Sequence, residues 1–306
     1  MGNLLQDKVA AVTGSGRGIG MGIVKLMAEE GAKVVVADLG VNVDGTGADT
    51  SFAETVATEI REAGGGAVAC TESVATMAGG EAIVQSAIDN FGKLDIVVTC
   101  AGILRDRMVF NMTEEEWDDV IAVHLKGTFS VAKHASILFR QQRSGRIITF
   151  SSTSGLYGNS GQANYGAAKD GIAGLTRVMA RDLGRYGVTS NAISPGADTR
   201  MTGTVPDEAR ALRTARGIGG GGAPRLRGHG EDVAPFVIWL ASDEAAHVNG
   251  HVFHVTEGVV TLLNEPEPVK TISKNGKWTV EELARVVPST LSHEIFNPAP
   301  SQVRDV

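Results

Sequence analysis

The chain has 306 residues, of which 42% are hydrophobic and 21% charged, and its formal net charge is -7. This composition is ordinary for a globular protein with a sizeable core, and an acidic chain without a basic block is not expected to bind nucleic acid. No apolar run reaches the roughly 18 residues that span a bilayer. The N-terminus has no basic signal-peptide region, and the two cysteines, Cys70 and Cys100, are expected to be reduced thiols. We therefore expect a cytoplasmic protein without a membrane segment or a metal site.

Short apolar runs alternate along the chain with longer amphipathic stretches. In the stretches, apolar residues recur at three- and four-residue steps, which predicts helices. One of these stretches opens with Thr113, and Glu116 follows three residues later, a spacing that predicts a capping box. Strands that are apolar on both faces and are followed by helices predict an α/β fold, a parallel sheet with helices on both faces. About seven strands are expected, at residues 8–13, 32–38, 67–70, 94–100, 145–151, 189–194 and 251–255.

A glycine-rich turn, "VTGSGRGIG", follows the first apolar run and opens the first predicted helix. Glycines allow a sharp turn and let backbone N–H groups approach a pyrophosphate at the positive end of a helix. The common dinucleotide fingerprint is G-x-G-x-x-G, and here its third place is Ile19. Such a turn can also serve only to pack a helix onto a strand. The residues expected to bind the cofactor here are Gly14, Ser15, Arg17, Gly18, Ile19 and Gly20.

Asp38 closes the second apolar run and bears on the choice of cofactor. An acidic side chain there can accept hydrogen bonds from both ribose hydroxyls of NAD, and it would repel the 2′-phosphate of NADP. Arg17 favours the opposite choice, because a guanidinium can bind that phosphate, but its side chain can also swing to solvent, whereas the carboxylate would lie directly on the ribose. We therefore predict NAD rather than NADP.

Tyr165 and Lys169 stand four residues apart in "ANYGAAKDG", which places them on one face of a helix. Ser152 ends the fifth predicted strand, and open α/β sheets bind ligands at the carboxyl ends of their strands. Free phenol has a pKa of about 10 and is a poor base at neutral pH, so a nearby ammonium is needed to lower it. We expect Tyr165 to be the general acid or base, Ser152 to hydrogen-bond the substrate oxygen, and Lys169 to assist both. The alternative for Tyr165 and Lys169 alone is a solvated helix face.

Taken together, "TGSGRGIG", "TCAG" (99–102), Ser152, "YGAAK" (165–169) and "SPGADT" (194–199) resemble the short-chain dehydrogenase/reductase family over about residues 5–260. The resemblance implies a single-domain, Rossmann-like, doubly wound parallel sheet, usually in a tetramer, so we expect a homotetramer or homodimer. It implies that Lys169 also holds the nicotinamide ribose and that Thr199 meets the nicotinamide amide. The further cofactor-binding residues that it implies are Ser73, Val74 near the adenine, Cys100, Ala101, Gly102, Tyr165, Pro195 and Gly196.

The chain departs from the family pattern in two places. Where the family usually has Asn-Asn, this chain has Thr99-Cys100, and Thr99 is expected to lose an amide contact that braces the central strands. The family's fourth catalytic residue is an asparagine, and His124 stands at its position. In the family the backbone carbonyl there holds a water that leads to the lysine. A histidine can leave this carbonyl free, so His124 is a candidate catalytic residue.

Three further segments bear on the substrate: "AGILRDR" (101–107), "VHLKGTF" (123–129) and "GLYGNSGQANYGAAK" (155–169). They resemble the (3R)-hydroxyacyl-CoA dehydrogenase part of multifunctional β-oxidation enzymes, in which histidine at position 124 is typical. Within them, "AGILRD" (101–106) and "GQANY" (161–165) also resemble 3-oxoacyl-carrier-protein reductases. Both resemblances imply a 3-hydroxyacyl or 3-oxoacyl thioester, most simply of CoA. The alternatives are a ring alcohol, such as a steroid or terpenoid, and a nucleotide-binding regulator without turnover.

We expect residues 1–262 to form the dehydrogenase domain, with residues 197–232 as a substrate lid that has glycine hinges. Arginines in this segment could receive CoA phosphates or could belong to a solvated helix and a glycine loop. Residues 263–306 are expected to form a C-terminal extension, with a short helix that starts at the Thr279–Glu282 capping pattern. This extension could cover the substrate opening, pack on a neighbouring subunit or act as a peripheral brace.

Overall fold

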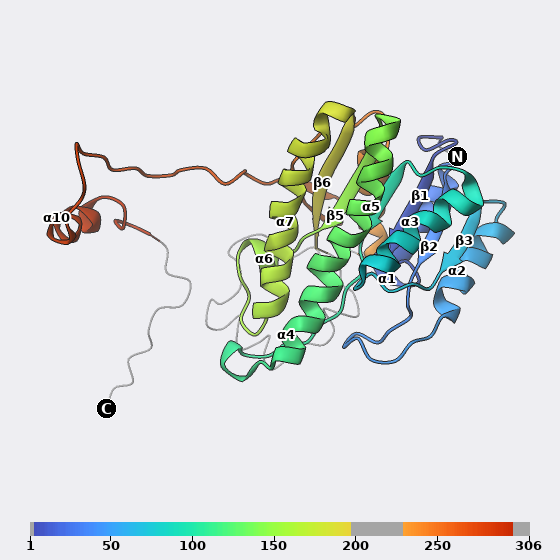
Figure 1. The fold of residues 1–306 in the computed structure, drawn as a ribbon, viewed down its shortest axis with the longest axis horizontal. Helices are drawn as coiled ribbons and strands as arrows, with labels where there is room; N and C mark the ends of the chain where they lie inside the picture. The colour runs from blue at the N-terminus through green and yellow to red at the C-terminus, as the bar shows by residue number, and fades with distance from the viewer. Residues whose placement is uncertain (1–2, 197–228, 296–306) are drawn as a thin grey trace. The chain divides into compact units, whose positions relative to one another are not determined.

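The fold is built on one eight-stranded sheet, and the computed structural model describes residues 3–196 and 229–295 of the chain. The strand order is β3-β2-β1-β4-β5-β6-β7-β8, and every neighbouring pair is parallel except β7 and β8, which are antiparallel. Figure 1 labels β1, β2, β3, β5 and β6 of this sheet. The strands are β1 (Val9–Thr13), β2 (Lys33–Ala37), β3 (Ala67–Cys70), β4 (Ile96–Thr99), β5 (Gly145–Phe150), β6 (Val188–Pro195), β7 (Val252–Thr256) and β8 (Val259–Leu262).

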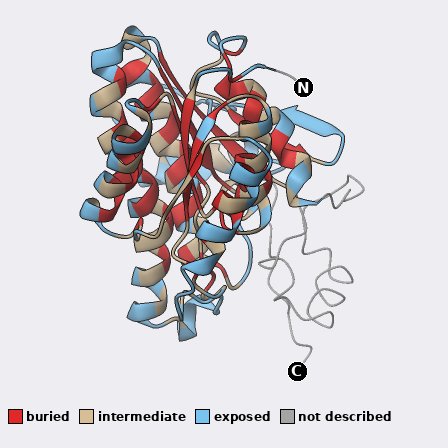
Figure 2. Ribbon diagram, turned by 90° about the vertical axis from the view of Figure 1, so that its right-hand side faces the viewer, coloured by how far each residue is buried: buried red, intermediate tan, exposed pale blue. Residues whose placement is uncertain are grey.

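Helices cover both faces of this sheet, because the buried strands are apolar on both faces. In β1, Ala10 and Val12 pack in the cluster that includes α1, α2 and α9, while Val9 and Ala11 pack in the cluster that includes α3, α5 and α7. Figure 2 shows the buried strands lying between the two helical layers. The helices are α1 (Gly18–Glu29), α2 (Ser51–Glu62), α3 (Met77–Phe91), α4 (Glu114–Ile121), α5 (Gly127–Gln142), α6 (Thr153–Leu156), α7 (Ala163–Leu183), α9 (Ala234–Ala241) and α10 (Val280–Val286).

The predicted Rossmann-like sheet is confirmed, and the seven expected strands correspond to β1 through β7. The eighth strand, β8, lies at the edge of the sheet, and all four of its residues are exposed. It was not predicted because it is short and has neither the continuous burial nor the regular alternation by which strands are recognised. Among the described residues, no helix is long and apolar enough to cross a membrane.

The long helical stretch predicted after Thr113 is divided in the structure by a π-helical turn, η2 (Ala122–Lys126), between α4 and α5. The predicted capping box is present, since the Thr113 side chain accepts from the Glu116 N–H and the Glu116 carboxylate accepts from the Thr113 N–H. π-Helical turns are rare and often occur at functional sites. This one turns His124 into the protein, where its side chain is 1% exposed.

The described residues up to Leu263 form one compact unit, and those from Asn264 belong to a second. Within the second unit, α10 begins with the predicted capping box between Thr279 and Glu282. The Lys274 ammonium also forms an ion pair with the Glu282 carboxylate and lies 5.3 Å from the centroid of the Trp278 ring. These contacts give the short helix local support that its seven residues alone would lack.

Two buried threonines on neighbouring strands differ in their hydrogen bonding. Thr99 on β4 pairs in register with Thr149 on β5, and both side chains are buried. The Thr149 hydroxyl lies 2.7 Å from the Thr176 hydroxyl, whereas the Thr99 hydroxyl has no hydrogen-bond partner within the described part of the chain. Within the described residues, the Thr99 hydroxyl therefore makes no hydrogen bond in place of the amide contact that Thr99 was expected to lose.

Replacing Thr99 by valine should raise the free energy of unfolding by about 1 kcal/mol, because a buried hydroxyl without a partner costs about that much or more. Thr149→Val is the matched control and should lower it by about 1 kcal/mol, since it breaks an existing hydrogen bond. Urea unfolding measures both. A Thr99→Val variant that is destabilised as much as Thr149→Val would contradict this interpretation.

Candidate active site

One edge of the sheet gathers most of the predicted site residues. The strands from β1 to β6 are parallel, so their carboxyl ends lie at the same edge. Gly14 follows β1, Asp38 follows β2, Cys100 follows β4 and Ser152 follows β5. A site at this edge is the usual ligand-binding position of an open α/β sheet.

The glycine turn between β1 and α1 is shaped by close backbone contacts. Gly14 has φ +68°, and a Cβ added to it would lie 2.7 Å from Ala101 Cα. A Cβ added to Gly20 would lie 2.3 Å from the Gly14 carbonyl oxygen, whereas one added to Gly18 would enter open space. Arg17, the N-cap of α1, makes no side-chain capping bond, so the first N–H groups of the helix are not capped by it. This cradle fits the pyrophosphate of a dinucleotide.

Two hydroxyls fix the turn to its neighbours. The Thr13 side chain accepts from the N–H groups of Cys100 and Ala101, at 3.1 and 3.2 Å, and so joins β1 to the segment after β4. The Ser15 hydroxyl donates to the Val12 carbonyl at 2.7 Å. Both hydroxyls therefore hold the backbone of the cradle.

Asp38 is held by the backbone at the end of β2. Its two carboxylate oxygens accept from the N–H groups of Gly16 and Gly40, at 2.8 and 2.7 Å. The Arg17 guanidinium donates to the Val41 carbonyl at 2.6 Å and lies 3.9 Å from the centroid of the Phe52 ring. The side chain is held between Val41 of the long loop after β2 and Phe52 in the first turn of α2.

The other predicted cofactor residues lie at or near the same strand ends. Ser73 and Val74 follow β3, and the Val74 carbonyl accepts from the Ser130 hydroxyl at 2.8 Å. Pro195 ends β6, and the Gly196 N–H donates to the Val255 carbonyl at 2.8 Å. The half-buried Ile19 lies in the first turn of α1. Thr199 and residues 197–228 of the predicted lid lie outside the described residues.

The structure brings Ser152, Tyr165 and Lys169 together. The Ser152 side chain interacts with the Tyr165 phenol and lowers the pKa of that phenol. The Lys169 ammonium lies 5.6 Å from the centroid of the Tyr165 ring and donates to the Phe150 carbonyl at 2.6 Å. Ser152 lies at the start of α6, and Tyr165 and Lys169 lie one turn apart on α7. A hydroxyl, a phenol and an ammonium thus form one connected group.

Burial shifts the pKa values of Tyr165 and Lys169 in opposite directions. Burial raises the pKa of the Tyr165 phenol to about 12, and the negative charge of Asp106 acts in the same direction, while the Ser152 hydrogen bond lowers it. Burial lowers the pKa of the Lys169 ammonium to about 8. Desolvation of the phenolate has the largest effect on the pKa of Tyr165.

His124 lies against the same group. Its ring meets the Tyr165 ring edge-on, with 5.1 Å between centroids, and its Nε2 lies 2.8 Å from the Ile103 carbonyl. Burial lowers the pKa of His124 to about 3, so the ring is neutral near pH 7. The His124 carbonyl accepts from the Gly127 N–H at the end of the π-turn. The position of the ring thus makes it a neighbour of the phenol.

Sequence reasoning missed Asn164, which is fully buried and hydrogen-bonded to the backbone N–H of Tyr165. The residue stands beside the tyrosine in "ANYGAAK", but its other partners, Arg105 and Glu116, are distant in sequence. Asn164 could have been identified only by predicting that α4 and the loop after β4 pack against the start of α7.

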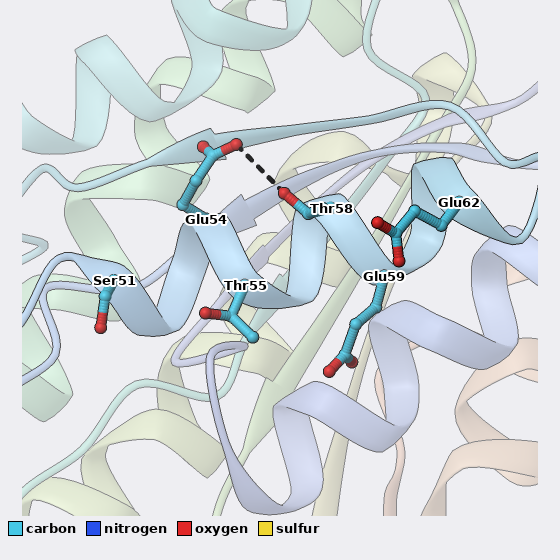
Figure 3. Close-up of a pocket in the computed structure, with 6 residues that line it drawn as sticks. All are labelled: Ser51, Glu54, Thr55, Thr58, Glu59 and Glu62. Atoms are coloured by element: carbon cyan, nitrogen blue, oxygen red, sulfur yellow. Dashed lines mark hydrogen bonds between the residues drawn. The ribbon is translucent and has the colours of Figure 1, made fainter.

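A separate pocket lies along α2, and its lining is acidic (Figure 3). Glu54 and Thr58 on this helix are joined by a 3.4 Å hydrogen bond, and Glu59 pairs with Lys25 of α1. An acidic lining does not suit a phosphate-bearing ligand. The pocket is lined by Ser51, Glu54, Thr55, Thr58, Glu59 and Glu62.

The described residues contain no group of three His, Cys, Asp or Glu side chains that could hold a metal ion.

Comparison with known proteins gives consistent results. Residues 14–260 match a family model described as Enoyl-(Acyl carrier protein) reductase. The crystal structure of a short chain dehydrogenase from Mycobacterium avium is similar, with a TM-score of 0.80 and 44% identity over 94% of this chain and 96% of that one.

Curated relatives include proteins with named acyl substrates. A hydroxyacyl-CoA dehydrogenase of Mycobacterium tuberculosis is 40% identical over 91% of this chain and 87% of its own length. A 3-oxoacyl-[acyl-carrier-protein] reductase of Vibrio cholerae is 39% identical over 84% of this chain and 99% of its own. The peroxisomal multifunctional enzyme type 2 of Mus musculus is 42% identical over 84% of this chain, which spans about a third (32%) of that enzyme's length. Both resemblances expected from the sequence are confirmed.

Proposed function

Because the chain belongs to the short-chain dehydrogenase/reductase family, we propose that it is an oxidoreductase that transfers a hydride between NAD and a 3-hydroxyacyl or 3-oxoacyl thioester. The observation that carries the proposal is the convergence of Ser152, Tyr165 and Lys169 at the sheet edge that also holds the glycine cradle. A proton-transfer group beside a dinucleotide cradle suits the interconversion of an alcohol and a ketone.

Each of the three side chains has a role in moving one proton. In ketone reduction, the Tyr165 phenol donates its proton to the substrate oxygen, and in alcohol oxidation it takes that proton back. The Ser152 hydroxyl donates a hydrogen bond to the same oxygen as negative charge develops on it. The Lys169 ammonium, the nearby cation, stabilises the phenolate that donation leaves behind.

We propose that the cofactor is held by the cradle of Gly14, Gly18 and Gly20, with Asp38 at the adenosine ribose. When bound, the oxidised nicotinamide accepts the hydride and adds a positive charge that favours the phenolate form of Tyr165. The position of Asp38 at the end of β2 supports NAD over NADP, since its carboxylate would repel a 2′-phosphate. Arg17 is held by Val41 and Phe52, which supports the same choice.

We propose a CoA thioester as the substrate because of the relatives. The Mycobacterium tuberculosis relative is named a hydroxyacyl-CoA dehydrogenase, and it matches 91% of this chain. The arginines of the predicted lid, which were expected to receive CoA phosphates, lie outside the described residues, since only residues 229–232 of that segment are described and none is an arginine.

We further propose that residues 1–262 form the catalytic domain and that residues 263–306 form an extension. We also propose that the protein is cytoplasmic and that the chain assembles as a homotetramer or homodimer. Exposed apolar side chains support assembly, among them Phe129, Ile137 and Val178 on α5 and α7. Sedimentation velocity should show a species of two or four chains, and a monomer at assay concentrations would contradict this assembly.

The proposal is tested with a panel of 3-hydroxyacyl-CoAs and ring alcohols offered with NAD and with NADP, read as the absorbance of the reduced nicotinamide. We expect turnover of the acyl-CoAs with NAD and competitive inhibition by free CoA. Turnover of ring alcohols with no inhibition by CoA would replace the substrate class. No turnover of any member with either cofactor would contradict the enzyme assignment.

The pH dependence of ketone reduction should follow Lys169. Tyr165, with a pKa of about 12, stays protonated and able to donate, whereas the Lys169 ammonium loses its proton above its pKa of about 8. With acetoacetyl-CoA, kcat/KM should be flat at lower pH and fall above about pH 8. His124, with a pKa of about 3, adds no step near neutrality. A step between about pH 5 and 7, where an unperturbed histidine titrates, would contradict this prediction.

A further inference from the structure

Asn164 is a fully buried amide that stands directly before Tyr165. Its Oδ1 accepts from the Tyr165 N–H at 2.7 Å. Its Nδ2 donates to the carbonyls of Arg105 and Glu116, at 3.0 and 2.8 Å. A single side chain thus makes three hydrogen bonds to the backbones of three different segments.

The bond to Tyr165 answers a need of the helix. The first N–H groups of an α-helix have no intrahelical acceptor. Helix α7 begins at Ala163, and its N-cap residue, Gln162, makes no side-chain capping bond. The Asn164 amide oxygen therefore satisfies the N–H of the residue that carries the phenol, and it does so from inside the first turn.

The two carbonyls belong to segments that pack against the start of α7. Arg105 lies in the loop after β4, and Glu116 lies in the first turn of α4. Ion pairs join the same two segments, with Arg105 to Asp119 at 2.9 Å and Arg107 to Glu116 at 2.7 Å. Asn164 therefore ties the start of α7 to a loop and a helix that are already joined to each other.

That loop also carries a charge that acts on Tyr165. The Gln162 side chain donates to the Asp106 carboxylate at 2.9 Å, and the Arg107 N–H donates to the Gly161 carbonyl at 2.8 Å. The negative charge of Asp106 raises the pKa of the Tyr165 phenol. A shift of the loop relative to α7 would therefore change both the position and the acidity of the phenol.

We propose that Asn164 is a positioning residue for the proton-transfer step, because it fixes the Tyr165 backbone to the loop after β4 and to α4. The inference rests on the proposed function, in which Tyr165 moves the proton. Asn164 itself touches no reacting atom in this account. Its loss would displace the phenol from the substrate oxygen, and a displacement of about 1 Å at a reacting group can cost about 10²-fold in rate.

Asn191 offers a matched control. It is 1% exposed, its Oδ1 accepts from the His251 N–H at 3.1 Å, and its Nδ2 donates to the Val248 carbonyl at 2.8 Å. Its bonds join β6 to the segment before β7. Like Asn164, Asn191 is a buried asparagine whose side chain hydrogen-bonds to backbone groups, but these groups belong to another part of the fold.

The test compares Asn164→Ala with Asn191→Ala in the reduction of acetoacetyl-CoA, with kcat, KM, the pH profile and thermal unfolding measured for each. Both variants should lose stability. Only Asn164→Ala should lose about 10²-fold in kcat, with little change in KM and a shifted pH profile. Equal losses of kcat in the two variants, or an Asn164→Ala variant with parental kcat and pH profile, would overturn the inference.

A second measurement needs no turnover. The chain has three tyrosines, so carbon-13-labelled tyrosine gives few NMR signals, and Tyr165→Phe identifies that of Tyr165. Asn164→Ser should change the chemical shift of the Tyr165 signal, and Asn191→Ser should not. Asn164→Ser is the milder substitution and is used if Asn164→Ala does not fold. An unmoved Tyr165 signal would overturn the inference. A parent protein that does not turn over acetoacetyl-CoA would instead count against the proposed function.

Discussion

Tyr165→Phe is expected to lower kcat by about 10²- to 10⁴-fold, the range that general acid–base catalysis contributes. The substitution removes the one hydroxyl that can exchange a proton with the substrate and keeps the ring that packs against His124. Binding of NADH, followed by its fluorescence, should change little, because the glycine cradle and Asp38 are untouched. The measurement is steady-state reduction of acetoacetyl-CoA.

Tyr157→Phe is the matched control for this substitution. Tyr157 is 70% exposed and follows α6, close in sequence to the site. Its hydroxyl has no part in the proposed proton transfer, so kcat should remain within about twofold of the parent, as for a surface change. A Tyr165→Phe variant that keeps parental turnover would favour the alternative of a nucleotide-binding regulator.

Asp38→Ser is expected to change the cofactor preference by about 10- to 100-fold in the ratio of kcat/KM for NAD to that for NADP. Hydrogen bonds to a charged group are worth about 1.5–3 kcal/mol, and about 1.4 kcal/mol corresponds to a tenfold change. Serine keeps an acceptor for the N–H groups of Gly16 and Gly40 but removes the charge that would repel a 2′-phosphate.

Asp44→Ser controls for a loss of charge in the same loop. Asp44 is exposed, and its carboxylate accepts hydrogen bonds from Thr46. Its removal should leave the ratio for the two cofactors unchanged. If Asp38→Ser also leaves this ratio unchanged, the carboxylate does not select the cofactor.

The parts of the fold that could be predicted are those with strong local patterns. Strands β1, β4 and β5 are buried along their full length, and their apolar runs identify them directly. Tyr165 and Lys169 could be paired because the four-residue spacing of a helix brings them together. The cradle could be predicted because close backbone approach requires glycine at Gly14 and Gly20.

Other features depend on contacts between distant segments. The amphipathic pattern from 113 to 142 runs through the π-turn without a break, so the turn that buries His124 could not be predicted. Arg17 is held by Val41 and Phe52, which the long loop after β2 brings to it. The burial of the Tyr165 phenol, which raises its pKa, could not be weighed against the charge of Lys169 from the sequence.

The account depends on the Tyr165 phenol exchanging a proton with a substrate that lies beside a bound nicotinamide. A crystal structure of the chain with NADH and acetoacetyl-CoA tests this most directly. It should place the Tyr165 and Ser152 hydroxyls within about 2.6–3.2 Å of the 3-oxo oxygen, with Asp38 at the adenosine ribose. A 3-oxo oxygen beyond the reach of Tyr165, in a complex that contains both ligands, would contradict the account.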